Sequence, residues 1–192
     1  LAQKLIDFGV KGQDVVGAYL DRTAYTVISQ LAVLKAGGVF LPIDHRYPKD
    51  RIDYMLNDCT VKLIITDKEL NSEWNVEYLN LNNYDFDDIL HTKIVNNRDD
   101  ACYIIYTSGS TSKPKGIICS RSSMWSFIKW EYNYLQLDSK VNVSQMSAPW
   151  FEPYLRDVFL ALFSGGCICI PTKREEFDPK AFYKKKKKMQ ID

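Results

Sequence analysis

Tyr106-Thr107-Ser108-Gly109-Ser110-Thr111-Ser112-Lys113-Pro114-Lys115-Gly116 is the stretch that decides how this chain folds. It follows a short apolar run at 101–106, whose β-branched and aromatic residues predict a buried strand. The loop that comes next combines hydroxyl side chains, a glycine and two lysines. Backbone N–H groups and hydroxyls bind phosphate oxygens in such loops, and a lysine neutralises their charge. The stretch therefore predicts a strand that leads into a phosphate-binding loop.

The loop also has a plainer interpretation. The common nucleotide-binding pattern G-x-x-x-x-G-K-[ST] is absent, because no glycine here is followed by lysine and then serine or threonine. Ser, Gly and Pro are frequent in ordinary turns, so composition alone also allows a polar surface loop without a ligand. The order of the residues has to separate the two interpretations.

Composition places the chain among globular proteins and excludes several classes of function. Its 192 residues are 46% hydrophobic and 26% charged, which suits one large domain or two small ones. The net charge is +1 and no basic stripe alternates with aromatic residues, so we expect no nucleic-acid partner. No apolar run approaches the roughly 20 residues that span a bilayer, so we expect no membrane partner. The lysine run at 184–188 is interpreted as a solvated helix face.

The chain has five cysteines, an odd number, and their spacing is not that of a disulfide scaffold. This usage predicts reduced, buried thiols and a cytoplasmic location. Cys167 and Cys169 would share one face of a strand, which is poor spacing for zinc, and we assign no metal ligands. The chain starts without methionine or a signal-peptide pattern, in what resembles the middle of an amphipathic helix. We therefore expect it to be part of a longer protein.

Hydrophobic periodicity predicts strands and helices in alternation. Helices are expected over 1–8, 23–36, 48–57, 122–135 and 154–163, and strands over 15–20, 39–41, 61–66, 76–81, 101–106, 116–119, 141–146 and 167–170. Residues 82–100 are expected to be irregular, and residues 189–192 to begin a further strand after a helix from 179. Alternation predicts parallel pairing and a layered α/β sheet-and-helix fold. Ligands bind such sheets at the carboxyl ends of the strands, where residues 107–115 would lie. His45 is interpreted as a loop residue.

The order of the loop residues resembles the ATP-binding signature T-S-G-[ST]-T-G-x-P-K-G of the adenylate-forming, AMP-binding superfamily. The stretch 107–116 matches at every position except Ser112, where the family prefers glycine. Residues 31–52 resemble the block L-K-A-G-G-x-[YF]-x-P-[IL]-D-x-x-Y-P-x-x-R-[IL] of nonribosomal peptide synthetase adenylation domains. Residues 151–159 lie where these domains carry F-D-x-S-x-x-[DE]-[IVM]-F. Residues 1–192 thus resemble a fragment of the large N-terminal part of an amino-acid adenylation domain.

The resemblance implies a ligase that uses ATP to convert an amino acid into aminoacyl-AMP. It also implies transfer of the aminoacyl group to the phosphopantetheine thiol of a carrier protein. The residues implied to hold the ATP phosphates are Thr107, Ser108, Gly109, Ser110, Thr111 and Lys115. Mg²⁺ is the implied metal, held largely by phosphates and water. If Ser112 occupies a position of positive φ, it costs on the order of 1 kcal/mol and alters nucleotide affinity slightly.

The resemblance also assigns a substrate-binding segment at Glu152, Pro153 and Arg156. Glu152 lies where amino-acid adenylation domains carry the aspartate that pairs with the substrate's α-ammonium group, and it is one methylene longer. The order of an acid, proline and arginine resembles the adenylation domain of α-aminoadipate reductases, where the arginine faces a side-chain carboxylate. We therefore expect an amino acid with an acidic or strongly polar side chain. The alternative is that Glu152 and Arg156 form an ordinary i,i+4 helix pair.

Several family elements fall beyond Asp192: the aspartate that binds the ATP ribose, the adenine-binding block, the hinge and the C-terminal domain with its catalytic lysine. We therefore assign no catalytic residue and expect the chain alone not to complete adenylation. Two other functions stay open, namely a fragment of an acyl-CoA or aryl-acid ligase and a non-catalytic nucleotide-binding or interaction module. Glu152 and the L-K-A-G-G block favour a substrate that carries an amine.

Overall fold

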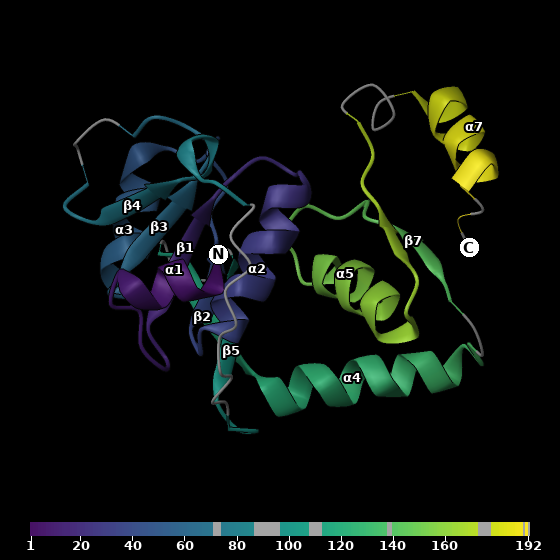
Figure 1. The fold of residues 1–192 in the computed structure, drawn as a ribbon, viewed down its shortest axis with the longest axis horizontal. Helices are drawn as coiled ribbons and strands as arrows, with labels where there is room; N and C mark the ends of the chain where they lie inside the picture. Colours follow the sequence, from purple (N-terminus) through teal and green to yellow (C-terminus); the bar gives the residue numbers. More distant parts are fainter. Residues whose placement is uncertain are drawn as a thin grey trace. The chain divides into compact units, whose positions relative to one another are not determined.

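The chain folds into two compact units, Leu1–Ser122 and Ser123–Asp192, which are drawn in the computed structural model of Figure 1. The structure describes residues 1–70, 74–86, 97–107, 113–137, 140–172, 178–189 and 191, without the side chains of 179, 182 and 185. Composition left one large domain and two small ones open, and the contacts divide the chain into two units.

Unit 1 is built on a six-stranded sheet with the strand order β4-β3-β1-β2-β5-β6. The strands are β1 (Val15–Tyr19), β2 (Val39–Pro42), β3 (Leu63–Thr66), β4 (Glu77–Asn80), β5 (Ala101–Thr107) and β6 (Lys115–Ser120). All neighbours are parallel except β5 and β6, which are antiparallel. Side chains of the central strands are fully buried, as in Leu63, Ile64 and Ile65 of β3. Burial on both faces explains why these strands are continuous apolar runs.

Helices cover both faces of this sheet. They are α1 (Ala2–Asp7), α2 (Ala24–Lys35) and α3 (Lys49–Asp58), with the short 3₁₀ helix η1 (Leu81–Asn83). The connection from β1 to β2 runs through α2, and the connection from β2 to β3 runs back past β1 through α3. Since parallel crossovers are right-handed, the two helices lie on opposite faces. Ile52, Met55 and Leu56 of α3 pack on the sheet in one buried cluster that includes Ile104 and Tyr106 of β5.

Unit 2 consists of helices around a two-stranded parallel sheet. Most of α4 (Arg121–Tyr134) belongs to it, together with β7 (Asn142–Ser144), α5 (Pro153–Ser164), β8 (Cys167–Cys169) and α7 (Pro179–Met189). Helix α5 packs on both strands, and Phe163 holds α4 through edge-on contacts with Trp125 and Tyr132. Helix α5 ends at Gly165 in the left-handed region (φ +71°), where glycine is favoured.

The expected alternation of helices and strands is present, and three expectations are wrong in part. The pair β5 and β6 is antiparallel, because the residues between Thr107 and Lys115 are too few for the crossover that parallel neighbours need. Helix α7 continues to Met189, so the strand expected from 189 does not begin there. The thiols of Cys102 and Cys169 are buried, but Cys167 is exposed.

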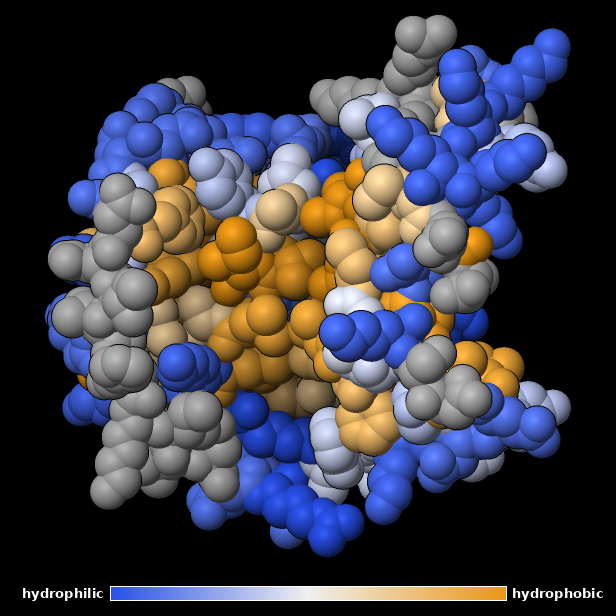
Figure 2. All heavy atoms as spheres, turned by 45° about the vertical axis from the view of Figure 1, so that its right-hand side comes forward, coloured by the Kyte–Doolittle hydropathy of each residue, from blue (hydrophilic) through white to orange (hydrophobic). Residues whose placement is uncertain are grey.

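Large hydrophobic side chains remain exposed in both units, and Figure 2 shows hydrophobic surface beside hydrophilic surface. In unit 1, edge strand β6 exposes Ile117 and Ile118 by 54% and 66%. In unit 2, α4 exposes the neighbouring rings of Phe127, Trp130 and Tyr134, of which the last two are stacked.

Candidate functional site

The predicted phosphate loop joins the two strands of the β5–β6 hairpin. The register pairs Thr107 with Lys115 and Tyr106 with Gly116. Thr107 and Lys115 are both exposed, at the edge of the sheet where β5 ends. The other predicted phosphate-binding residues, Ser108, Gly109, Ser110 and Thr111, lie outside the described residues, as does Ser112. The described ends of the loop are thus at the carboxyl edge of a parallel sheet, where α/β proteins bind their ligands.

Two ammonium groups stand where the chain enters β6. Lys113 and Lys115 are exposed, and the Lys113 Nζ atom lies 5.8 Å from the centre of the Tyr54 ring. Exposed lysines of this kind act as mobile positive charges that pair with phosphate oxygens. Together with the exposed Thr107 they are the described residues of the predicted phosphate site.

Tyr106 anchors the first end of the loop through its hydroxyl group. The hydroxyl donates a hydrogen bond to Asp58 Oδ2 at 2.5 Å and lies 3.0 Å from Cys59 Sγ. Burial, and then the hydrogen bond to Asp58, raises the pKa of Tyr106 above its usual value, so the hydroxyl keeps its proton as a donor. The sequence pattern did not assign a role to Tyr106 or Asp58, because 48 positions separate the two residues in the chain.

The predicted substrate-binding segment lies in unit 2, at the start of α5. Glu152 is the N-cap residue of this helix, is exposed, and makes no side-chain capping hydrogen bond. Pro153 occupies the first helical position, where its fixed φ and missing N–H are tolerated. The structure therefore presents the Glu152 carboxylate at a helix N-terminus on the surface of the unit.

Arg156 pairs with two carboxylates of unit 2. Its guanidinium nitrogens lie 3.8 Å from Glu131 Oε1 of α4 and 3.5 Å from Asp157 Oδ1, while 48% of the side chain stays exposed. Burial raises the pKa of Glu131, and the nearby Arg156 partly offsets this effect. Neither ion pair involves Glu152, so the i,i+4 pair of Glu152 with Arg156 is not formed in this conformation.

Asp157 is the acid that fixes the segment before α5. It is 3% exposed, and its Oδ2 atom accepts the backbone N–H groups of Met146 and Ser147, both at 3.1 Å. The matching family pattern carries Asp or Glu at this position, and that pattern is the sequence signal for the residue. The structure gives a physical reason for that acid, since it supplies an acceptor to two backbone donors.

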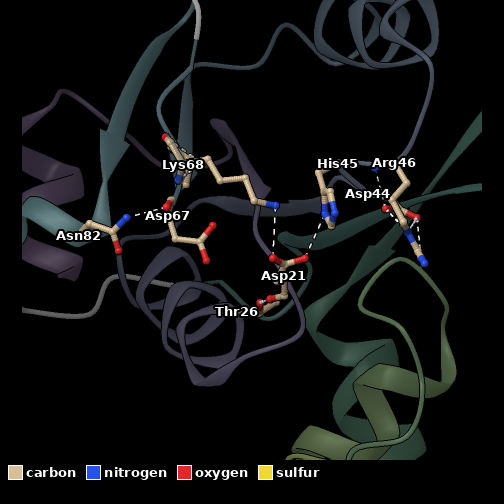
Figure 3. A network of polar contacts seen from close by, with 9 residues as sticks. Asp21, Thr26, Asp44, His45, Arg46, Asp67, Lys68 and Asn82 are labelled. Atoms are coloured by element: carbon tan, nitrogen blue, oxygen red, sulfur yellow. Dashed lines mark hydrogen bonds and ion pairs between the residues drawn. The ribbon is translucent and has the colours of Figure 1, made fainter. Parts of the chain in front are cut away.

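A second polar cluster lies at the carboxyl ends of β1, β2 and β3 (Figure 3). Asp21 lies between His45, whose Nδ1 atom is 3.2 Å away, and Lys68, whose Nζ atom is 3.3 Å away. Asp44 is 4% exposed and receives the Arg46 guanidinium through two nitrogens, each at 3.0 Å. The two Asp21 pairs join the loops that follow β1, β2 and β3, whereas Asp44 and Arg46 pair within one loop. His45 lies in one of these loops, where the sequence placed it.

A cavity of about 270 Å³ opens beside this cluster. Aromatic rings of Tyr19, Tyr47 and Trp74 line it together with Lys49 and Lys68. Lys68 pairs with an acid of the cluster, and Lys49 Nζ lies 2.7 Å from an Asp53 carboxylate oxygen. Because these acids offset its cations, the cavity does not have the charge of an anion site.

Neither a metal centre nor a membrane span is found in the described residues. They contain no group of three or more His, Cys, Asp or Glu side chains placed to hold a metal ion. No helix in the same part of the chain is long and apolar enough to cross a membrane.

Comparison with known protein families identifies the family of this chain. The sequence matches the family described as AMP-binding enzyme over residues 1–192. This chain belongs to the AMP-binding enzyme family.

Relatives of this member of the family are large synthases. Tyrocidine synthase 3 of Brevibacillus parabrevis is 38% identical over 189 residues, 95% of this chain and 3% of that protein. Bacitracin synthase 1 of Bacillus licheniformis is 32% identical over 183 residues, 93% of this chain and 4% of that protein. The AMP-binding chain therefore spans only a small part of the length of these relatives.

Solved structures confirm the fold of this AMP-binding chain. The nonribosomal peptide synthetase FmoA3, in its AMPPNP-bound form, aligns over 99% of this chain and 21% of its own, with a TM-score of 0.84 and 22% identity. The N-terminal subdomain of NpsA from Klebsiella oxytoca, in complex with 3-hydroxybenzoyl-AMSN, aligns over 99% of this chain and 48% of its own, with a TM-score of 0.83 and 21% identity. The expected family and the expected α/β fold are both confirmed.

Proposed function

We propose that this chain is part of an adenylation domain that activates an amino acid with ATP and passes it to a carrier-protein thiol. One observation carries the proposal. The residues of the T-S-G-[ST]-T-G-x-P-K-G pattern connect β5 to β6 at the carboxyl edge of a parallel sheet, in a member of the AMP-binding enzyme family. The place of the loop in the fold and its sequence support the same ligand, a nucleoside triphosphate.

In the proposed reaction, a carboxylate oxygen of the amino acid attacks the α-phosphorus of ATP. A new P–O bond forms, the bond to pyrophosphate breaks, and aminoacyl-AMP is the product. Thr107, Ser108, Gly109, Ser110 and Thr111 would hold the β- and γ-phosphates, and Lys115 would neutralise their charge. Placement of this kind lowers the barrier by orientation and by electrostatic stabilisation. Mg²⁺ would be held mainly by phosphate oxygens and water, which this ion prefers over protein cages.

The proposed amino-acid site uses Glu152, Pro153 and Arg156. The Glu152 carboxylate is exposed and without a capping hydrogen bond, so it can pair with an α-ammonium group. Pro153 fixes the backbone next to it. Arg156 would contact an acidic or strongly polar substrate side chain, in competition with Glu131 and Asp157.

We also propose that the complete enzyme works in the cytoplasm with a phosphopantetheine carrier protein as partner. The support is the length and kind of the relatives, which are named as tyrocidine and bacitracin synthases. The thiol of the carrier would attack the carbonyl carbon of aminoacyl-AMP, and AMP would leave.

Amino-acid-dependent exchange of pyrophosphate into ATP, measured on the full-length enzyme with each amino acid, tests the proposal. We expect exchange with one or a few amino acids. Glu152→Gln should raise the KM of the amino acid, while Glu77→Gln, an exposed acid on β4, should leave it unchanged. Arg156→Ala should change the substrate profile.

The same assay separates the competing functions. Exchange that depends on aryl or fatty acids, and not on amino acids, would indicate an aryl-acid or acyl-CoA ligase. ATP binding without exchange for any acid would indicate a non-catalytic nucleotide-binding module. An unchanged profile of the Arg156→Ala variant would remove that residue from the substrate site.

A further inference from the structure

Both described ends of the phosphate loop contact the C-terminal half of α3. At the first end, the Tyr106 hydroxyl donates to Asp58 at 2.5 Å, and the Tyr106 ring meets the Tyr54 ring edge-on, with centroids 6.4 Å apart. At the second end, the Lys113 ammonium lies over the other ring of this pair, Tyr54, at 5.8 Å. The Tyr54 hydroxyl also reaches Asp58, with a longer separation of 3.4 Å. One helix end therefore contacts the chain before and after the loop.

The β5–β6 hairpin leaves space for the Tyr106 ring at Gly116. Gly116 lies opposite Tyr106 in the register, and a Cβ atom at Gly116 would stand 3.2 Å from the Tyr106 Cζ atom and 3.2 Å from Ile104 Cγ2. Only glycine leaves ordinary van der Waals room for the ring at this place. The ring is 6% exposed, so its position and the direction of its hydroxyl are fixed by packing.

We infer that Tyr106 and Asp58 are positioning residues for ATP, which hold the base of the phosphate loop against the end of α3. The inference rests on the proposed function. Asp58 has no direct contact with the phosphates in this role. It acts by holding Tyr106, and Tyr106 fixes the backbone of its neighbour Thr107, the first residue of the phosphate-binding pattern. A loop held in its binding conformation loses less entropy when the ligand binds.

Variants of the full-length enzyme test the inference. Tyr106→Phe removes only the hydroxyl, and Asp58→Ala removes its acceptor together with the longer contact of the Tyr54 hydroxyl. Each should raise the KM and the Kd of ATP about tenfold, which corresponds to about 1.4 kcal/mol, and should change kcat and the KM of the amino acid less than about twofold. Asp58→Asn keeps an acceptor oxygen and should restore part of the ATP affinity. In the double variant the two losses should be clearly less than additive, because both changes remove the hydrogen bond that Tyr106 and Asp58 share.

A matched control separates positioning from general stability. Ile65→Val removes one methylene from the fully buried β3 and weakens the same sheet at a distance from the loop. It should lower the melting temperature without a change in the affinity for ATP. Equal losses of ATP affinity in Ile65→Val and Tyr106→Phe would overturn the inference, as would multiplied effects in the double variant. If Tyr106→Phe does not fold, the comparison of Asp58→Ala with Asp58→Asn decides, because Asp58 is exposed.

Equilibrium dialysis with ATP alone keeps the two proposals distinguishable. A wild-type enzyme that binds ATP but exchanges pyrophosphate with no acid refutes the proposed function, and the ratios of Kd still judge the positioning role. A wild-type enzyme that exchanges normally, with an unchanged ATP affinity in Tyr106→Phe and Asp58→Ala, refutes the positioning role alone. A wild-type enzyme that binds no ATP refutes both.

Discussion

Replacing Asp157 by alanine tests how the chain fixes the segment before the proposed substrate site. The carboxylate is buried and accepts the backbone N–H groups of Met146 and Ser147. The two donors are not equally dependent on it. The N–H of Met146 has a second acceptor, the carbonyl oxygen of Ser144 at 2.9 Å. The loss should therefore fall mainly on Ser147.

The magnitude follows from this asymmetry. A buried donor that loses its partner costs about 1–3 kcal/mol, and only Ser147 loses the acceptor that the structure shows for its N–H. The ion pair between Asp157 and Arg156 is 3.5 Å long and its Arg156 side is 48% exposed, so it adds little. We expect Asp157→Ala to lower the free energy of unfolding of unit 2 by about 2 kcal/mol. Asp157→Asn keeps one acceptor oxygen and should lose about half as much, roughly 1 kcal/mol.

Urea unfolding followed by tryptophan fluorescence measures this loss, because Trp125, Trp130 and Trp150 all belong to unit 2. Hydrogen exchange in the full-length enzyme gives a second measurement. Where closing is fast relative to the chemical exchange step, a loss of about 2 kcal/mol predicts roughly 30-fold faster exchange over residues 145–152. Glu152→Ala is the matched control on the same helix, since its side chain makes no capping bond, and it should change stability by less than about 0.5 kcal/mol. A loss below that figure for Asp157→Ala, or an equal loss in both Asp157 variants, would refute the reasoning.

Three further outcomes are expected. Gly166→Ala should prevent stable folding of unit 2, because its Cβ atom would collide with the Val141 backbone, and far-ultraviolet circular dichroism with urea unfolding checks this. Burial raises the pKa of the Cys102 thiol to about 12, so iodoacetamide at pH 8 should modify exposed Cys167 and leave Cys102 intact until the chain unfolds. Burial also raises the pKa of Glu131 in the folded protein. The charged carboxylate therefore lowers the stability at pH values above this raised pKa, and the loss disappears as the pH falls through the raised pKa. Glu131→Gln should therefore be stabilising relative to wild type at pH 7, with an advantage that shrinks toward pH 4.5 in urea titrations at both pH values.

The core of unit 1 was predictable because its strands are continuous apolar runs with clear ends. Residues 61–66 indicate a buried strand by composition alone, and Leu63–Thr66 of β3 are all buried in the structure. The two glycines after residue 36 marked the end of α2, and Gly37 has a φ of +86°, which other residues rarely adopt. Positions where the backbone conformation excludes most side chains can therefore be predicted from a single sequence.

The antiparallel pairing of β5 and β6 could also have been predicted from the sequence, although the alternation of helices and strands indicated parallel pairing. Parallel neighbours need a crossover of about a dozen residues or more. Only residues 108–114 lie between the paired residues Thr107 and Lys115, which is too few. Asp58 and Tyr106 are different, since their contact depends on how α3 packs on the sheet. No local spacing could have predicted that hydrogen bond.

Arg156 shows how magnitudes separate two roles that the sequence left open. The spacing suggested a pair with Glu152, whereas the guanidinium lies near Asp157 and near Glu131, which belongs to another helix. These ion pairs are 3.5 and 3.8 Å long on a side chain that is 48% exposed, so each contributes less than about 1 kcal/mol. A hydrogen-bonded contact with a substrate carboxylate is worth about 1.5–3 kcal/mol, which is enough to draw Arg156 from these partners. Since Arg156→Ala then costs little stability, a changed amino-acid profile in that variant would report on the substrate contact itself.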